Sequence, residues 1–512
     1  MTHPQTTSIL KIMKTYLIIM MALMHFMVSF GQESFELVIK TSGTEIPHDI
    51  IQLENHNYVI LGMQQKITGY STATGVVWMA NEFGTLIDSI VISKPDTNVA
   101  LSNIHQYGED LLISGFLAYD ESGIDETPLY YWLLDRNLNL LYEQMIPLDS
   151  NHFLASFLEF RLDGDQLFIA GCARHKETAK YGFDLFIYKY DLQSHFLDSN
   201  FLVMPGNQRS SGYLKTLNSD YHIIFSWGAW GYPVGYSSGY YALFDSDLNW
   251  LVTDSLPGDI HWDNFAMNLT DSTYLLSGRE YVLIAPPSVD EFRSVIYEMA
   301  FPNVPIRSFE YHMGTDTTSH PAAEQSFDTT STGEIYFAGT ANIDAAVFPY
   351  QETPSWIFLS KLDRDLNPIW TKLYGGDMFY YLYTMKATHD DGAVMACRTY
   401  NHLTQGRETD ILILKVNQDG LIVGTGEELP NISVQDAIVY PNPGNENLNI
   451  QSGPQINGAL FELFDMNGNL VLATNLDERL KTLSTTWLST GTYPYRITFD
   501  NKIVGSGKWV KQ

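Results

Sequence analysis

A motif of about 54 residues recurs seven times along this chain, and it limits the possible folds more than any other feature. In each copy an apolar strand, a polar turn and a second strand follow one another. The turns begin near residues 81, 135, 191, 245, 301, 363 and 417, so their separations are 54, 56, 54, 56, 62 and 54 residues. Self-similarity at a fixed period of this length indicates a repeat architecture.

Each copy also contains a short apolar segment with a small residue at its end, roughly 20 residues before the turn segment. The clear examples end at Gly62, Gly115, Gly171, Gly278 and Gly339, and the weaker ones end at Ser226 and Cys397. Each copy therefore holds about four strands, and all-strand repeats of about 40 to 55 residues are typical of propeller blades. The sequence predicts an all-β fold with a seven-bladed β-propeller over residues 32–428. Two stacked sheets or two separate β-domains remain the alternatives.

The two ends of the repeat region predict how the ring closes. Copy seven lacks a clear outermost strand after Ile422, whereas the segment 35–40 precedes copy one and resembles the outer strands of other copies. We expect this segment to complete the seventh blade, because closing the ring removes unprotected ends.

The turn of the sixth copy, KLDRDLNPIW at residues 361–370, resembles the beginning of a calcium loop. Asp363, Asp365 and Asn367 alternate there. A calcium loop of the EF-hand type needs Gly at its sixth place and Glu at its twelfth, but Pro368 and Tyr374 occupy these places. We therefore expect a hairpin turn, in which Asp and Asn bond to their own backbone, and no metal site. Whether another kind of calcium site forms at these turns stays open.

The net charge argues against nucleic acid as a partner, and the positions of the two cysteines argue against a disulfide between them. The 512 residues include 29 Lys and Arg against 59 Asp and Glu, giving a net charge of -30. Such a surface repels phosphate backbones, so we expect no nucleic-acid partner. Cys172 and Cys397 lie in copies three and seven, too far apart for the Cα separation of about 7 Å that a disulfide allows. We expect two free, buried thiols.

The N-terminus has the pattern of an export signal. Lys11 and Lys14 precede an apolar run at residues 16–30, and Ser29 and Gly31 are the small residues that a cut before Gln32 requires. The run of about 15 residues is shorter than the roughly 20 needed to span a bilayer. We predict a cleaved signal peptide over residues 1–31 and no transmembrane helix in the mature chain.

The composition changes after Glu428, where residues 429–434 read as a linker. Residues 435–512 contain alternating strands joined by Pro and Gly turns, which predicts a small β-sandwich of about seven strands. Its motifs are a YPNP segment, a D-x-x-G turn, an L-x-x-G-x-Y strand and a terminal basic run. Their residues are Tyr440, Pro441, Asn442, Pro443, Asp465, Gly468, Gly491, Tyr493, Gly507, Lys508, Val510 and Lys511.

Taken together, these motifs resemble the type A C-terminal sorting domain of the type IX secretion system. The resemblance implies a Gram-negative bacterium, with the Sec export machinery and the type IX translocon and sorting apparatus as partners. It also implies removal of the domain and surface attachment or release of the remainder. Pro494 departs from the pattern and predicts an edge strand or a bulge at this point.

The sequence contains no recognisable catalytic pattern. G-x-S-x-G, H-E-x-x-H and Walker-type glycine motifs are missing from it. His261, His312, His320 and His402 lie in or beside expected loops without the spacing of metal ligands. We expect no cofactor and assign no catalytic residue. Asp and Glu are plentiful, so a carboxylate pair that cleaves glycosides stays open, and an absence of enzymatic activity is favoured without being decided.

Copy four departs from the repeat at residues 226–241. Trp227, Trp230, Tyr232 and Tyr236 are separated there by Gly, Pro and Ser, so we expect them in a flexible loop. Aromatic faces in a loop suit recognition of a glycan or protein ligand. The alternative is that they cover the face of the propeller or pack on the next blade.

These observations predict a secreted or cell-surface propeller protein, exported through the type IX system, with a binding or adhesion function. Two alternatives stay open: a secreted enzyme acting on polysaccharides or peptides, and a structural subunit of a surface assembly. Propellers serve all three purposes, so the fold does not decide between them.

Overall fold

The computed structural model describes residues 34–511 with gaps. The gaps are 42, 67–72, 120–127, 148–151, 155–157, 176–183, 203–212, 218–220, 231–235, 257–259, 284–289, 315–316, 345–348, 404–405, 407, 423–436, 441–443, 453–457, 466–468, 479 and 500–501. The predicted signal peptide and linker lie outside the described residues. All 37 elements of the described chain are strands, so the all-β class is confirmed. The described ranges contain no helix long and apolar enough to cross a membrane.

The described strands before residue 417 form seven antiparallel sheets, which we number as blades 1 to 7. Blade 1 contains β2 (Gly43–Gln52), β3 (Tyr58–Lys66), β4 (Thr74–Ala80) and β5 (Leu86–Ile92). Blade 2 contains β6 (Thr97–Tyr107), β7 (Asp110–Tyr119), β8 (Leu129–Leu134) and β9 (Leu140–Ile146). Blade 3 contains β10 (His152–Leu154), β11 (Glu159–Asp163), β12 (Gln166–His175), β13 (Asp184–Asp191) and β14 (Leu197–Leu202). Blade 4 contains β15 (Tyr213–Leu217), β16 (Tyr221–Trp230), β17 (Tyr236–Asp245) and β18 (Trp250–Ser255).

The remaining three sheets follow the same plan. Blade 5 contains β19 (Ile260–Asn268), β20 (Thr273–Leu283), β21 (Asp290–Ala300) and β22 (Val304–Tyr311). Blade 6 contains β23 (Ser319–Pro321), β24 (Phe327–Thr329), β25 (Ile335–Ala341), β26 (Trp356–Leu362) and β27 (Pro368–Gly375). Blade 7 contains β28 (Phe379–Ala387), β29 (Ala393–Tyr400), β30 (Asp410–Val416) and β1 (Phe35–Ile39).

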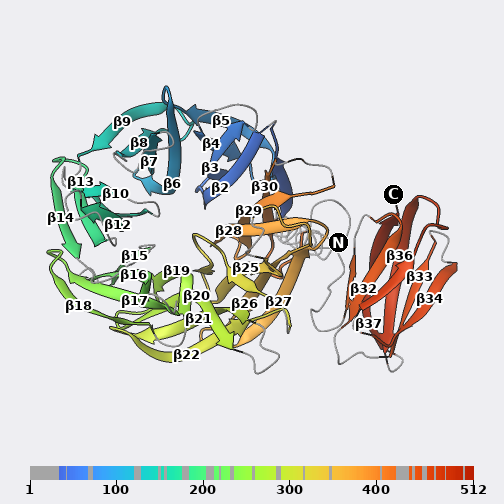
Figure 1. Cartoon of the computed structure of the whole chain (residues 1–512). Helices are drawn as coiled ribbons and strands as arrows, with labels where there is room; N and C mark the ends of the chain where they lie inside the picture. The colour runs from blue at the N-terminus through green and yellow to red at the C-terminus, as the bar shows by residue number, and fades with distance from the viewer. Residues whose placement is uncertain are drawn as a thin grey trace, which may run out of the picture.

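The seven sheets stand around a common centre (Figure 1). The first strand of a blade, such as β2, β6 or β28, lies on the inside of the ring, and the last strand, such as β9, β14 or β22, lies on the outside. The faces of neighbouring sheets pack against each other; Trp132 of blade 2, with none of its surface exposed, packs with Val77 and Met79 of blade 1. The propeller class is therefore confirmed.

The N-terminal strand closes the ring as predicted. β1 pairs antiparallel with β30, with Phe35 opposite Lys415 and Ile39 opposite Ile411. Phe35 and Ile39 are buried in the core cluster that joins blade 7 to blade 1. The Nζ atom of Lys40 lies 3.1 Å from a carboxylate oxygen of Asp410. Ring closure is therefore non-covalent and combines backbone pairing with apolar burial.

The turn between β26 and β27 is held by its own side chains. Oδ1 of Asp363 accepts hydrogen bonds from the backbone N–H groups of Asp365 (2.9 Å) and Asn367 (2.8 Å), and Oδ2 accepts one from Nδ2 of Asn367 (2.9 Å). These bonds lower the pKa of Asp363. Donors within the turn thus occupy the carboxylate, as expected for a capped hairpin.

A leucine in this turn adopts a left-handed backbone conformation. Leu366 has a φ of 62°, and Leu138 and Leu248 have 60° and 62° at the equivalent places in blades 2 and 4. This conformation costs a non-glycine residue about 1–2 kcal/mol. All three side chains are buried in seams between blades. Burial of a leucine contributes about 1.5–3 kcal/mol, so it offsets the strain.

The cysteine prediction is confirmed. Cys172 and Cys397 are both free and buried. Burial strongly raises the pKa of the Cys397 thiol, which keeps it protonated. These residues act as small core side chains.

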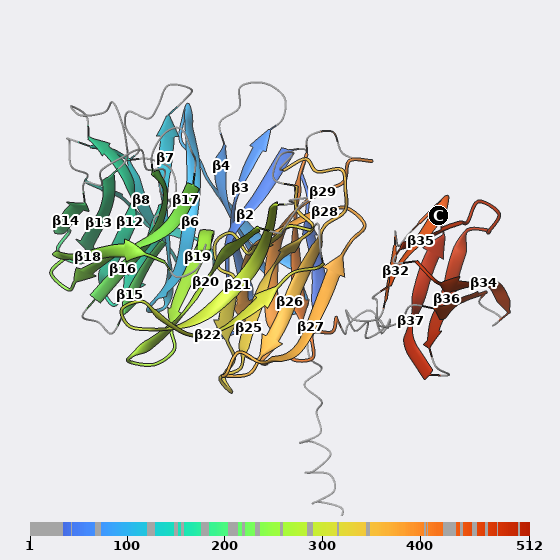
Figure 2. The same ribbon diagram turned by 60° about the horizontal axis from the view of Figure 1, so that its bottom comes forward.

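The described strands of the C-terminal region form two sheets, which confirms the expected sandwich of seven strands (Figure 2). One sheet contains β31 (Ala437–Tyr440), β32 (Asn447–Ser452) and β35 (Leu480–Ser484). The other contains β34 (Leu470–Leu476), β33 (Ala459–Phe464), β36 (Gly491–Phe499) and β37 (Lys502–Lys511). Phe461 and Trp509 are fully buried in the core between them.

The expectation for Pro494 is wrong. β36 lies between β33 and β37, so it is not an edge strand, and its irregularity lies between Ile497 and Thr498. Pro494 pairs with Lys508 of β37, but the pairing with β33 ends one residue away, at Tyr495. The missing N–H of proline therefore breaks no bond of that ladder.

Candidate binding site at the centre of the ring

The innermost strand is irregular in at least six of the seven blades. The register shifts between Pro47 and Asp49 in β2, between Leu101 and Asn103 in β6 and between Leu382 and Thr384 in β28. A shift also occurs in β19, and the inner edges of blades 3 and 6 each consist of two short strands. Bulges re-aim side chains and free backbone groups from the ladder. The wall of the ring is thus interrupted at one level.

Side chains from neighbouring blades satisfy the freed backbone groups. The carboxylate of Asp49 in blade 1 accepts hydrogen bonds from the N–H of Ile50 (2.9 Å) and from the N–H of Ile104 in blade 2 (3.1 Å). At the equivalent place in blade 2, Oδ1 of Asn103 accepts a bond from the N–H of Phe160 in blade 3 (3.2 Å). These bonds fix the inner strands to one another, so the site is preorganised.

Charged and titratable side chains gather beside these irregular positions of the inner strands. Nζ of Lys386 on β28 lies 3.4 Å from Oδ1 of Asp49 on β2. Arg161 on β11 of blade 3 lies over the ring of Phe265 on β19 of blade 5, 5.2 Å from its centroid. Both cations and Asp49 act electrostatically on His105 of β6. We call the set of His48, Asp49, His105, Arg161, Tyr383 and Lys386 the central polar cluster.

The bulged residues of blades 1 and 7 meet in this cluster. His48 and Tyr383 make an edge-to-face ring contact with centroids 6.1 Å apart. Nδ1 of His48 lies 4.0 Å from Oε1 of Glu324, which lies between the two inner strands of blade 6. Arg398 hydrogen-bonds to Tyr383, and its Nε donates to the hydroxyl of Thr409 (3.0 Å). Three blades thus converge on one place.

Both histidines of the cluster are neutral at pH 7. Burial lowers the pKa of His48 and of His105 to about 4, although Asp49 opposes the shift in each case. Among the described residues, Nε2 of each ring is buried and has no hydrogen-bond partner. A buried polar atom without a partner is costly, so these two nitrogen atoms mark places where the described residues leave a polar group unsatisfied.

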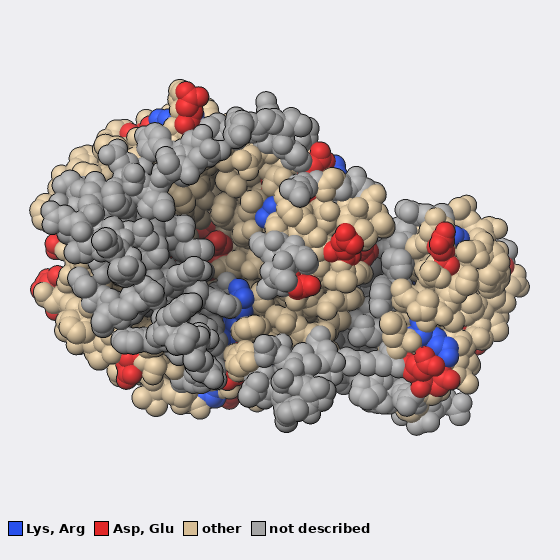
Figure 3. All heavy atoms as spheres, in the orientation of Figure 1, with Lys and Arg blue, Asp and Glu red and all other residues tan. Residues whose placement is uncertain are grey.

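The centre of the ring is hollow on the face seen in Figure 3. Basic and acidic side chains lie on the wall of this hollow beside uncharged atoms. The side chains of Lys386 and Arg161 are 23% and 24% exposed, so both are accessible to a small molecule.

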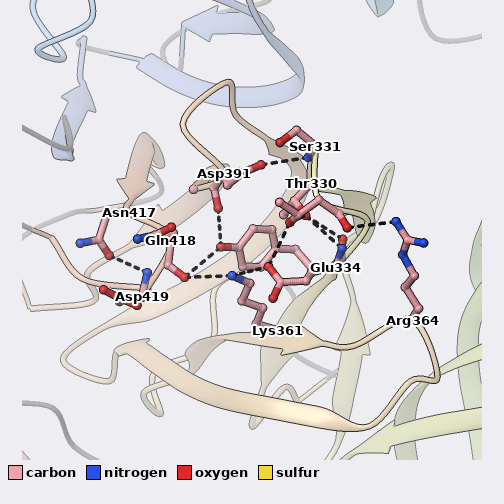
Figure 4. A network of polar contacts seen from close by, with 12 residues as sticks. Thr330, Ser331, Glu334, Lys361, Arg364, Asp391, Asn417, Gln418 and Asp419 are labelled. Carbon is pink, nitrogen blue, oxygen red and sulfur yellow. Dashed lines mark hydrogen bonds and ion pairs between the residues drawn. The ribbon is translucent and has the colours of Figure 1, made fainter. Parts of the chain in front are cut away.

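A second polar network joins the turns of blades 6 and 7 (Figure 4). The hydroxyl of Tyr336 donates to the carbonyl groups of Asp391 (2.8 Å) and Gln418 (3.2 Å). Nζ of Lys361 lies 2.7 Å from Oε2 of Glu334 and 5.7 Å from the centroid of the Tyr336 ring. The donors of this network are matched by acceptors of the protein itself. We interpret it as a stabilising contact between the last two blades.

The described residues contain no group of three or more His, Cys, Asp and Glu side chains that could hold a metal ion. His320 illustrates this. It lies in β23 and is 3% exposed, and its ring contacts Phe292 and Tyr381 rather than other potential ligands.

The aromatic segment of copy four does not have the expected loop conformation. Trp227 and Trp230 lie in β16 and Tyr236 lies in β17, with Trp230 paired opposite Tyr236. The two strands continue on either side of the Gly and Pro residues, so the aromatic residues belong to a long hairpin. Tyr232 lies outside the described residues. A ligand-binding role for the four residues stays a prediction.

The predicted sorting residues are distributed over the sandwich. Tyr440 ends β31, Gly491 and Tyr493 lie in β36, and Gly507, Lys508, Val510 and Lys511 lie in β37. Asp465 accepts the N–H of Asn469 (2.8 Å), as in the propeller turns. Lys511 is buried and its Nζ donates to Asn445. Pro441, Asn442, Pro443 and Gly468 lie outside the described residues, and the sorting role of the set stays a prediction.

Comparison with known proteins identifies the C-terminal region. Residues 438–512 match the secretion system C-terminal sorting domain family. No curated protein matches the chain. The chain is thus an all-β, propeller-type protein that ends in a type IX sorting domain. It is a secreted or cell-surface protein.

Several solved structures are similar to the chain in fold. The β-propeller domain of the Trilobed protease from Pyrococcus furiosus is 12% identical (TM-score 0.42), with 80% of this chain and 97% of that chain covered. Polysaccharide lyase Uly1 is 12% identical (TM-score 0.46), with 76% and 100% covered. Drosophila Plexin A, in complex with Semaphorin 1b, is 7% identical (TM-score 0.40), with 74% and 86% covered. These likenesses concern the fold alone.

Proposed function

We propose that this protein is a binding module of the cell surface or surroundings, and that it holds its ligand at the centre of the ring. The observation that carries the proposal is the convergence of His48, Tyr383 and Glu324 from three blades. Clefts with a few convergent polar groups are the usual place for ligands.

The geometry around Asp49 favours binding over catalysis. Its carboxylate accepts two backbone hydrogen bonds and faces Lys386. These contacts make the carboxylate a structural link between blades 1, 2 and 7. Its role in our proposal is to position Lys386 and the inner strands.

One observation favours an enzyme as the second candidate. The imidazole of His48 is neutral and lies beside the phenol of Tyr383, which Arg398 contacts. An imidazole and a phenol can exchange protons with a substrate. Incubation with polysaccharides and peptides, followed by detection of new chain ends, distinguishes this candidate. Products from the wild type that are lost in the His48→Ala variant would favour it.

The binding proposal is tested on a glycan array with the full chain and two double variants. In one variant His48 and Tyr383 are replaced by Ala, and in the other Trp227 and Trp230 are replaced by Ala. We expect the wild type to bind, the first variant to lose binding and the second to show whether the hairpin contributes. Equal binding by the wild type and the His48/Tyr383 variant would contradict a site at the centre.

Export is proposed to require both ends of the chain. The N-terminal signal would direct the chain to the periplasm, and residues 435–512 would direct it through the outer membrane before their removal. Expression of chains with and without residues 435–512 in a bacterium that has a type IX system tests this. We expect the truncated chain in the periplasm. Its appearance in the medium at the wild-type level would contradict the proposal.

A further inference from the structure

Lys386 has fewer anionic contacts than Lys415 and Lys361, the buried lysines of blades 7 and 6. Lys415 is 1% exposed, and its Nζ contacts both carboxylate oxygens of Asp390 (2.9 and 3.0 Å) and the carbonyl of Val416 (2.9 Å). Lys361 pairs with Glu334 at 2.7 Å. Among the described residues, Lys386 has only the 3.4 Å contact with Asp49. An ammonium group has three donors, so two of its donors are free.

Arg161 is in a similar state. Its Nε lies 2.9 Å from Oε1 of Glu159, but the geometry is not that of a hydrogen bond. Within the described chain its guanidinium has no hydrogen-bond partner and lies over Phe265. A guanidinium has five donors in a planar fork that matches an oxyanion such as a carboxylate. Both cations therefore have donors that the protein does not use.

The two cations lie on inner strands that are bonded to one another. Lys386 contacts Asp49, whose carboxylate accepts the N–H of Ile104 on β6, and Asn103 of the same strand accepts the N–H of Phe160 beside Arg161. Arg161 and Lys386 both act electrostatically on His105, which lies between their strands in the ring order. The imidazole of His105, which lies between them, is neutral at pH 7. It therefore does not repel a bound anion, and it does not neutralise the two cations as a carboxylate would. Its Nε2 is buried without a partner. Two cations with unused donors and a buried imidazole nitrogen without a partner among the described residues thus lie along the inner wall of blades 7, 1, 2 and 3.

The net charge of the chain makes this arrangement unusual. The chain carries -30 overall, so its surface repels anions at long range. At physiological ionic strength such repulsion is screened beyond about 8 Å. Within the hollow, the contacts of a small anion are therefore set by the nearest groups. Leaving partly buried cations incompletely paired costs free energy, which an anionic ligand would recover.

We propose that the central polar cluster binds the oxyanion of a small ligand, a carboxylate or sulfate group on a sugar, through Lys386 and Arg161. This inference rests on the proposed binding function and specifies its ligand class. Charged contacts from Lys386 and the guanidinium fork of Arg161 would hold the anionic group, and Nε2 of His105 would accept a hydroxyl hydrogen of the same ligand.

Isothermal titration calorimetry of the full chain with three probes tests the inference. The probes are D-glucuronate, D-glucose 6-sulfate and the neutral D-glucose. We expect both anions, or one of them, to bind more tightly than glucose, and the stronger of the two identifies the group. Binding should weaken as salt is added, because the contacts are ionic.

Variants of Lys386 and Arg161 test where the anion binds. Replacement of Lys386 or Arg161 by Met should weaken anion binding by about tenfold to a hundredfold, the range for loss of a charge-assisted hydrogen bond. Lys386→Arg should restore part of it. Lys481→Met is the matched control, because Lys481 is 24% exposed and also pairs with one carboxylate, that of Asp477. Thermal unfolding of each variant verifies that it is folded.

Three results would overturn the inference. Equal affinity for glucose and for the anions would refute recognition of an oxyanion, but it would agree with a ligand site at the centre of the ring. Unchanged anion affinity in folded Lys386→Met and Arg161→Met variants would place the anion elsewhere. Absence of a heat signal with either anion at its solubility limit would also refute the inference. The glycan array would then test the proposed binding function independently.

Discussion

Replacement of Ile39 by Ala tests how much β1 contributes to the ring. Ile39 is 3% exposed and lies opposite Ile411 in the pairing of β1 with β30. Truncation of a fully buried Ile to Ala costs about 2–5 kcal/mol, because apolar contacts are lost and a cavity remains. Stabilities of about 5–15 kcal/mol are usual for a domain, so this loss is a large fraction.

Val38→Ala is the matched control on the same strand. Val38 is 57% exposed, so its truncation should change the free energy of unfolding by no more than about 0.5 kcal/mol. Urea unfolding measures both variants. Hydrogen exchange adds a local reading: amides of β30 should exchange faster in Ile39→Ala, since β1 then dissociates from β30 more often.

Unfolding of Ile39→Ala at the same urea concentration as Val38→Ala would contradict a contribution of β1 to ring closure. Unchanged protection of the β30 amides in Ile39→Ala would contradict it as well. Either result would mean that the ring is held closed by the packing of blades 1 and 7 without β1.

Three further predictions concern the seams, the acid response and the turns. Tyr336→Phe removes the hydroxyl that donates to the carbonyl groups of Asp391 and Gln418, and should cost about 1–3 kcal/mol in urea unfolding. Burial lowers the pKa of His222 from 6.5 to about 4. Between these two pH values the unfolded chain binds a proton that the folded chain does not bind. The free energy of unfolding should therefore decrease as the pH is lowered from 6.5 to 4, by up to about 3 kcal/mol for this residue. The variant His222→Leu should show a correspondingly flatter pH dependence. Calcium should leave the Tm unchanged, since the carboxylate of Asp363 is occupied by donors of its own turn; a rise in Tm would indicate a metal site.

The propeller could be predicted because its evidence is local and repeated. In five of the seven turns an Asp or Asn side chain bonds to the backbone N–H four residues later, as Asp363 and Asn367 do, so one short motif marks most of the blades. The closure could be predicted because one copy lacked a strand that the other end of the chain supplied. Neither inference required knowledge of side-chain contacts between blades.

The centre of the ring could not be predicted in the same way. Asp49 and Lys386 lie in the first and last blades, and only closure of the ring brings them together. The bulges at His48 and Tyr383 depend on one extra residue in each strand, which an alternating pattern does not reveal. Alignment of the copies does place Asp49, Asn103 and Glu159 at one position, and that signal could have indicated the inner wall.

The hairpin of blade 4 shows the opposite error. Gly and Pro between Trp227 and Tyr236 favour a loop, yet both aromatic residues lie in paired strands. The ladder of β16 and β17 is long enough to override these local breakers, because tertiary pairing prevails over weak propensities.

The most direct test of a ligand site at the centre is the NMR signal of the histidine rings. Titration of the full chain with D-glucuronate should shift the ring signals of His48 and His105, whose Nε2 atoms are buried without partners. The ring of His222, buried against Phe168 in the seam of blades 3 and 4, should not respond. Shifts at His48 and His105 alone would support the account. Saturable binding that leaves both rings unchanged would contradict it.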